Sequence, residues 1–104
     1  MKKQEVSSFD WDNGNTKKVQ SRLSINEVEV FFYQTLSVKA DVEHSKTEPR
    51  FIAAGYSEKK KPMFVCFTFR EIAGVLKIRV ISARYMHKKE AKAYEVFKEE
   101  HKKD

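Results

Sequence analysis

The chain has 104 residues, of which 40% are hydrophobic and 35% charged, and its formal net charge is +6 at pH 7. This length suits one domain, and the single cysteine, Cys66, excludes a disulfide framework and any multi-cysteine zinc site. No apolar run approaches the ~20 residues of a membrane span, and the N-terminus lacks the apolar core of a signal peptide. We therefore expect a cytoplasmic protein without membrane contact, whose positive charge favours an anionic partner or serves solubility alone.

The N-terminal quarter of the chain predicts weak local structure. Polar residues 1–8 indicate a flexible tail ahead of a single domain over residues 9–104. Apolar and acidic side chains alternate in Phe9–Asp12, which is typical of a short strand. Asp12 is placed to cap a helix from Asn13 to Arg22, which its glycine and asparagines weaken.

A stronger helix is predicted from Ile25 to Gln34. Ser24 and Glu27 have the spacing of a capping box, and apolar residues follow at helical period. A strand over Leu36–Val42 and a polar loop over residues 43–49 come next.

The second half of the chain reads as a β-meander followed by a helix. Three segments rich in β-branched and aromatic residues are joined by connectors short enough for hairpins, and they cover about Phe51–Tyr56, Met63–Arg70 and Leu76–Ala83. A mostly apolar stripe predicts a last helix from His87 to Lys102. The order β-α-α-β-β-β-β-α predicts an α+β fold with its helices packed on one face of an antiparallel sheet.

Positive charge is concentrated on the predicted meander rather than in a tail. Eight basic residues and two acidic ones lie from Arg50 to Arg84. Arginines held by a rigid scaffold can bind phosphates at fixed distances. RNA or DNA is therefore the first partner to consider.

The pairing of the last two strands decides where these cations point. Burial favours the register that sets the apolar face of Met63–Arg70 beside Ile78 and Val80, because a slip of one residue would bury Arg79 among phenylalanines. This register gathers four side chains on the opposite face: Thr68, Arg70, Lys77 and Arg79. They either bind phosphate together or solvate an exposed sheet face.

Arg84 has the opposite parity to Arg79 in its strand. It lies at the strand end, where a bulge or turn can redirect its side chain toward the same site. The alternatives are that it caps a carbonyl group or pairs with Glu90.

Several motifs of the chain resemble those of the BrnT family, bacterial toxins of type II toxin–antitoxin systems. The strongest is IRVISARYMHKKEAKAY at residues 78–94. Weaker matches are FDWD at residues 9–12, Asn15, Lys18, NEVE around Glu27, RFIAAGYS at residues 50–57 and FTFR at residues 67–70. The resemblance spans about residues 9–97.

This resemblance implies a RelE-like fold, a small twisted sheet with two N-terminal helices and one C-terminal helix. It implies an endoribonuclease that inhibits translation and needs no metal or other cofactor. The implied partner is a BrnA-like ribbon-helix-helix antitoxin, in a complex that is usually a dimer of heterodimers. Operator DNA would be contacted only through that antitoxin.

Cleavage without a metal needs cations at the phosphate and groups that move protons. By resemblance, Arg70, Arg79 and Arg84 are the expected phosphate-binding arginines. Lys18 is expected to position substrate or transfer a proton, or else to be a solvated helix lysine. His44 is the expected general base because of its unperturbed titration range, although most loop histidines are inert.

Further residues complete the candidate set. The expected RNA contacts are Lys77, Thr68, Arg50 and Trp11, of which Trp11 is alternatively a core anchor. Glu27 and Tyr94 are weaker candidates, since a capping box and a buried helix stripe already account for them.

The chain departs from the family at one informative place. Members often carry a His-Gly-Val or similar turn between the first two helices, where this chain has Ser21, Arg22 and Leu23. The alternative function is therefore a catalytically degenerate toxin that acts as an antitoxin-binding co-repressor. Direct nucleic-acid binding by the cationic face alone ranks last, since no stacking motif accompanies it.

Overall fold

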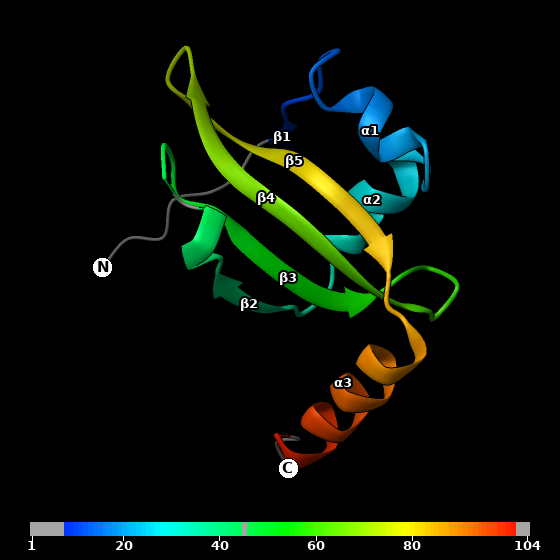
Figure 1. Ribbon diagram of the computed structural model, residues 1–104. Helices are drawn as coiled ribbons and strands as arrows, with labels where there is room; N and C mark the ends of the chain where they lie inside the picture. Colours follow the sequence, from blue (N-terminus) through cyan, green and yellow to red (C-terminus); the bar gives the residue numbers. More distant parts are fainter. Residues whose placement is uncertain (1–7, 45, 102–104) are drawn as a thin grey trace.

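The computed structural model describes residues 8–44 and 46–101 and confirms the α+β class. The elements of this part follow the chain as β1 (Ser8–Phe9), α1 (Thr16–Gln20), α2 (Ile25–Phe31), β2 (Ser37–Ala40), the 3-10 helix η1 (Val42–His44), β3 (Phe51–Tyr56), β4 (Pro62–Ile72), β5 (Val75–Tyr85) and α3 (Lys88–Glu100). Figure 1 shows a twisted sheet dominated by the long β4–β5 hairpin. Of the predicted tail only Ser8 lies within the described residues, where it forms β1 together with Phe9.

The five strands form one mixed sheet in the order β1-β5-β4-β3-β2. All pairs from β2 to β5 are antiparallel, whereas β1 runs parallel to β5, so the prediction of a purely antiparallel sheet is wrong at this edge. Parallel pairing is possible because the intervening chain, with two helices and three strands, forms a long crossover connection. Within the described residues, the parallel pairing covers Ser8 and Phe9, and the Asp10 N–H also donates to the Ile78 oxygen at 2.8 Å. The side chains of Asp10 and Asp12 accept hydrogen bonds from Arg79.

The predicted register of β4 against β5 is confirmed. Phe67 lies opposite Val80, Thr68 opposite Arg79, and Arg70 opposite Lys77. Beyond this stretch Cys66 pairs with Ser82, so Ile81 is an extra, bulged residue in β5. The bulge reverses the parity of β5 and brings Arg84 opposite Phe64, onto the face that carries Arg70 and Arg79.

The core lies between the sheet and the first two helices. Val19 of α1 and Val28 and Phe31 of α2 are completely buried against Val65 and Val80 of the sheet. Each such side chain contributes roughly 1.5–3 kcal/mol of hydrophobic stabilisation. We call this side of the sheet the helix-covered face.

The other side, which we call the open face, carries Phe64, Cys66, Thr68 and Arg70 of β4. Helix α3 lies at one end of the open face, where the Tyr94 ring packs 5.5 Å from the ring of Tyr56, so the prediction that the helices share one face is wrong for α3 (Figure 1). The stripe of α3 finds apolar residues there because the helix-covered face is already filled.

Helix ends differ from the predictions for local reasons. The first helix starts at Thr16 with Asn15 as its N-cap, not at Asn13 with Asp12 as cap, and it ends at Gln20. Ser24 caps α2 as predicted, accepting from the Glu27 backbone N–H at 3.0 Å. This helix ends at Phe31, before the predicted Gln34, whose side chain instead bonds the β3 backbone at Tyr56.

The remaining bounds differ by a few residues. The strand predicted over Leu36–Val42 is shorter, and a 3-10 turn replaces the first residues of the predicted loop. Strands β4 and β5 extend one to two residues beyond their predicted ends, because the hairpin continues past β3. The predicted end of the last helix, Lys102, lies outside the described residues.

Candidate functional site

A groove of about 500 Å³ crosses the open face of the sheet. Its floor is apolar and is formed by one or two residues from each central strand: Ile52, Phe64, Cys66, Ile81 and Ala83. Its walls carry five basic side chains and two carboxylates: Lys18, Arg22, Lys39, Arg50, Arg84, Asp41 and Glu90. We call this feature the cationic groove.

The basic residues border the cationic groove on two flanks of the open face, one near β5 and the other near β2. Lys18 of α1 and Arg22, in the turn after α1, border it on the β5 side. Lys39 of β2 and Arg50, directly before β3, border it on the other side. Positive charges facing one another across an apolar floor suit a strand of nucleic acid, with phosphates on the walls and bases or sugars on the floor.

His44 and Asp41 form a hydrogen-bonded pair on the wall of the groove. The His44 Nδ1 lies 2.9 and 3.1 Å from the two carboxylate oxygens of Asp41. Because an ionised carboxylate only accepts hydrogen bonds, Nδ1 carries a proton and donates it. In the neutral tautomer that carries its proton on Nδ1, the other ring nitrogen, Nε2, has a free lone pair and can accept a proton, as a general base must.

Arg84 joins the floor of the groove to α3. Its guanidinium donates to both oxygens of Glu90 at 2.8 and 3.0 Å and to the backbone oxygen of Tyr85 at 3.2 Å. Both sequence-based alternatives for Arg84, a carbonyl contact and a pair with Glu90, are thus observed together. The hydrogen bonds from Arg84 and from the His87 N–H lower the pKa of Glu90 to about 2.

Cys66 contributes its thiol to the apolar part of the floor. Burial raises the pKa of this thiol above its ordinary value. A raised pKa keeps the sulfur protonated and weakly nucleophilic near neutral pH. Its place in the groove is therefore that of a small apolar residue.

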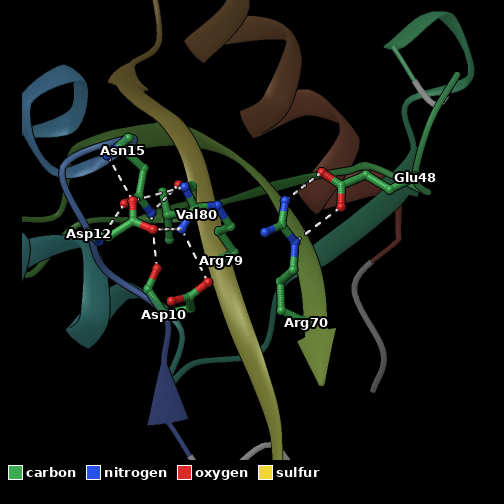
Figure 2. A network of polar contacts seen from close by, with 8 residues as sticks. Asp10, Asp12, Asn15, Glu48, Arg70, Arg79 and Val80 are labelled. Carbon is green, nitrogen blue, oxygen red and sulfur yellow. Dashed lines mark hydrogen bonds and ion pairs between the residues drawn. The ribbon is translucent and has the colours of Figure 1, made fainter. Parts of the chain in front are cut away.

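Arg79 lies on the open face but outside the cationic groove. Its guanidinium donates to Asp10 at 3.1 Å and to both oxygens of Asp12 at 3.1 and 3.0 Å (Figure 2). The hydrogen bonds to Asp12 raise the pKa of Arg79 and lower that of Asp12. With its side chain only 14% exposed, Arg79 fastens the segment after β1 to β5.

Asn15 adds further hydrogen bonds between the segment after β1 and strand β5, and we call the contacts of Asp10, Asp12, Asn15 and Arg79 the β1–β5 hydrogen-bond network. Its side-chain amide donates to the backbone oxygens of Val80 at 2.8 Å and Asp10 at 3.0 Å, and its carbonyl oxygen accepts from the Asp12 N–H at 2.9 Å. Asn15 is 3% exposed, so these bonds satisfy backbone groups that water does not reach. The motif residues from Asp10 to Asn15 therefore have a structural explanation.

Arg70 points away from Arg79 on the same face. It donates from Nε and Nη2 to the two oxygens of Glu48 at 3.2 and 3.1 Å (Figure 2). These hydrogen bonds lower the pKa of Glu48. The Arg70 side chain is 43% exposed, so it is accessible to a ligand, but neither arginine lines the cationic groove.

Three other predicted contacts also lie outside the groove. Thr68 is buried, and its hydroxyl donates to the Pro49 oxygen at 2.6 Å. Trp11 packs against the core and donates from its indole N–H to Glu29 at 2.8 Å, in agreement with its alternative role as an anchor. Lys77 is half-buried opposite Arg70.

The groove thus brings together four of the predicted site residues, Lys18, His44, Arg50 and Arg84. Sequence reasoning missed Arg22, Lys39 and Asp41. Two spacings carried a usable signal: Lys18 and Arg22 are four residues apart, and Asp41 and His44 are three apart, which places each pair on one side of a helical turn. Lys39 had no such signal.

Two absences concern only the part of the chain that the structure describes. Over residues 8–44 and 46–101, no three or more His, Cys, Asp or Glu side chains are placed to hold a metal ion. Within the same ranges no helix combines the length and the apolar character that crossing a membrane requires.

Comparison with known proteins decides the family. The family model described as the ribonuclease toxin BrnT of type II toxin–antitoxin systems matches residues 10–90. The chain belongs to the BrnT family. No curated protein matches the chain. The BrnT match includes the groove residues from Lys18 to Glu90 and also the residues of the β1–β5 hydrogen-bond network, among them Asp12, Asn15 and Arg79.

Proposed function

We propose that this chain is the toxin of a type II toxin–antitoxin system, a cytoplasmic endoribonuclease that cuts RNA in the cationic groove and thereby inhibits translation. The observation that carries the proposal is the gathering of Lys18, Arg84 and the Asp41–His44 pair around one apolar-floored groove. It supplies charge for a phosphate and a proton acceptor within one site.

The proposed reaction is attack of a 2′-hydroxyl on the adjacent phosphorus. His44 Nε2 takes the proton of the hydroxyl as the new O–P bond forms, and Asp41 stabilises the resulting imidazolium. Arg84 and Lys18 stabilise the negative charge that builds on the phosphate oxygens. The bond to the 5′-oxygen breaks, and Lys18 gives a proton to that leaving oxygen, so the products are a 2′,3′-cyclic phosphate and a 5′-hydroxyl.

This route needs no metal, since the basic walls provide the positive charge at the phosphate. Arg50, Arg22 and Lys39 would hold neighbouring phosphates along the groove. Arg70, Arg79 and Lys77 add positive charge to the same face beyond the groove. A phosphate that bound Arg70, Arg79 or Arg84 directly would compete with the carboxylate partners of that arginine, which are Glu48, Asp10 with Asp12, and Glu90 respectively.

We propose that the fold and the complex of this chain are those of the family. A RelE-like domain with a β-α-α-β-β-β-β-α order agrees with the observed elements. We propose that a BrnA-like ribbon-helix-helix antitoxin neutralises the chain in a dimer of heterodimers, and that operator DNA is bound only through that antitoxin.

A second function is favoured by one observation. Ser21 occupies the position where family members often have a histidine, and its hydroxyl donates to the Lys18 oxygen at 2.7 Å within its own turn. If that histidine is indispensable, the chain is a degenerate toxin that serves as an antitoxin-binding co-repressor.

One assay separates the two functions. Purified chain is incubated with end-labelled RNA in EDTA, with and without the antitoxin. Cleavage that the antitoxin stops supports the ribonuclease. Intact RNA together with tight antitoxin binding supports the co-repressor.

A further inference from the structure

A second depression, of about 520 Å³, lies between α3 and the outer strands of the open face. Apolar and aromatic residues of the open face and of α3 form most of it: Ile52, Ala54, Phe64, Ala93, Tyr94 and Phe97. We call it the apolar trough. The helix contributes residues at positions 90, 93, 94 and 97, a spacing that places them along one side of α3.

The apolar trough is open at its rim. Phe97 is 43% exposed. Large apolar side chains that border a concave, apolar surface mark a contact with another molecule more often than isolated exposed residues do. The trough also borders Ser37 and Lys39 of β2, the outermost strand of the described sheet on this side.

The trough and the cationic groove are one continuous surface. They share four lining residues: Lys39, Ile52, Phe64 and Glu90. A molecule that lies along both would meet apolar side chains at the α3 end and five basic side chains at the other end. The matching occupant has an apolar stretch followed by acidic residues.

The family supplies a protein partner of this kind, since toxins of type II systems bind an antitoxin. We propose that the trough and the groove together form the antitoxin's docking surface, with apolar antitoxin side chains in the trough and acidic ones in the groove. The acidic residues then occupy the place of RNA phosphates, so antitoxin and RNA exclude one another. This inhibitory part rests on the proposed ribonuclease function, whereas the docking itself does not.

The test uses the antitoxin encoded by the reading frame adjacent to this gene. Isothermal titration calorimetry measures its affinity for this chain, with both proteins at full length. Phe97→Asp places a carboxylate in the trough and should weaken binding about 100-fold, the loss typical of a hot-spot residue. Val96→Asp is the matched control, because Val96 is the preceding residue of α3, is 52% exposed and does not line the trough. Its affinity should stay within about threefold of wild type, as for a residue outside the interface core.

A second variant guards against local unfolding of α3. Ala54→Asp changes the strand side of the trough, on β3 opposite Phe64, and should also weaken binding at least tenfold, the loss expected of a residue in the interface core. Arg22→Glu tests the groove half, and it should weaken binding and reduce its dependence on salt. Circular dichroism checks that each variant is folded.

Two outcomes would overturn the proposal. One is wild-type affinity in both folded trough variants. The other concerns a dimer of the free chain, measured by sedimentation. If Phe97→Asp abolishes such a dimer and leaves the affinity for the antitoxin unchanged, a second copy of the chain occupies the trough instead. If the wild-type chain and all variants leave RNA uncut, the ribonuclease proposal fails, but the binding result still tests the docking surface. If the chain is active, Phe97→Asp should cut RNA at the wild-type rate and escape inhibition by the antitoxin.

Discussion

Arg84 lies over the ring of Phe64, its neighbour across the β4–β5 ladder, with 5.3 Å between the guanidinium carbon and the ring centroid. The same guanidinium binds both oxygens of Glu90 in α3. Phe64 and Glu90 line both the cationic groove and the apolar trough. Arg84 is therefore positioned where the cationic groove meets the apolar trough, and it reaches this place because Ile81 is bulged.

Replacing Arg84 should remove transition-state stabilisation. Arg84→Ala is expected to lower kcat/KM for RNA cleavage by about 100-fold, the cost of losing one donor to a developing oxyanion. The matched control is Arg70→Ala, which removes the same charge from the same face outside the groove, and we expect a loss within about tenfold from weakened phosphate attraction. Initial rates on a labelled RNA measure both, and equal losses in the two variants would contradict the assignment.

The Asp41–His44 pair should act as a general base and its positioning residue. His44→Ala is expected to lower kcat by about 10²–10⁴-fold, the usual contribution of general acid–base catalysis. Asp41→Asn should lower kcat less and should change the pH profile, because an amide can donate to Nδ1 as well as accept from it and so no longer selects the tautomer with the proton on Nδ1. Val42→Ala, an exposed residue between them, is the control with unchanged kcat. A His44→Ala variant with wild-type kcat would assign the base elsewhere.

Asn15 should matter for stability rather than for chemistry. Asn15→Ala removes three hydrogen bonds and leaves the buried Val80 oxygen unsatisfied, which should cost about 2–4 kcal/mol of unfolding free energy. Asn13→Ala, at an exposed neighbouring asparagine, should stay within about 0.5 kcal/mol of wild type. Urea unfolding followed by fluorescence or circular dichroism compares them. A similarly small change in the free energy of unfolding of both variants would show that the β1–β5 hydrogen-bond network contributes little to stability.

The Glu90 carboxylate should make stability depend on pH in the acid range. Its pKa falls from an ordinary 4.5 to about 2 in the folded chain. A lowered pKa contributes stability that is complete above pH 4.5 and is lost as the pH falls toward 2. Because Asp12 and Glu48 titrate in the same direction, the measurement is the difference between wild type and Glu90→Gln.

In thermal unfolding, Tm of Glu90→Gln should lie below that of wild type at pH 6. The two curves should converge as the pH is lowered through this window. A constant difference at all pH values would show that the Arg84–Glu90 pair does not depend on ionisation of the carboxylate.

Much of the sheet could be predicted because burial leaves few choices. Strand β3 has the predicted ends, and the β4–β5 register follows from the need to keep Arg79 away from phenylalanines. The capping box at Ser24 likewise located the start of α2. These features depend on residues near one another in sequence or on one apolar face.

The rest depends on contacts that no local pattern encodes. Alternation indicated that a bulge could redirect Arg84 but not that Ile81 is the bulged residue. The partners of Arg70 and Arg79 lie 22 and more than 65 residues away. The place of α3 on the open face depends on space left by the first two helices, and so the groove itself could not be predicted.

The most direct test of the central claim is cleavage of end-labelled RNA in EDTA by a Lys18→Ala/Arg84→Ala double variant that is confirmed to be folded. Wild type and Arg70→Ala should produce fragments with 2′,3′-cyclic phosphate ends, and the double variant should leave the RNA intact over the same time. Wild-type fragment yields from the double variant, or loss of cleavage in Arg70→Ala alone, would show that RNA is not cut in the cationic groove.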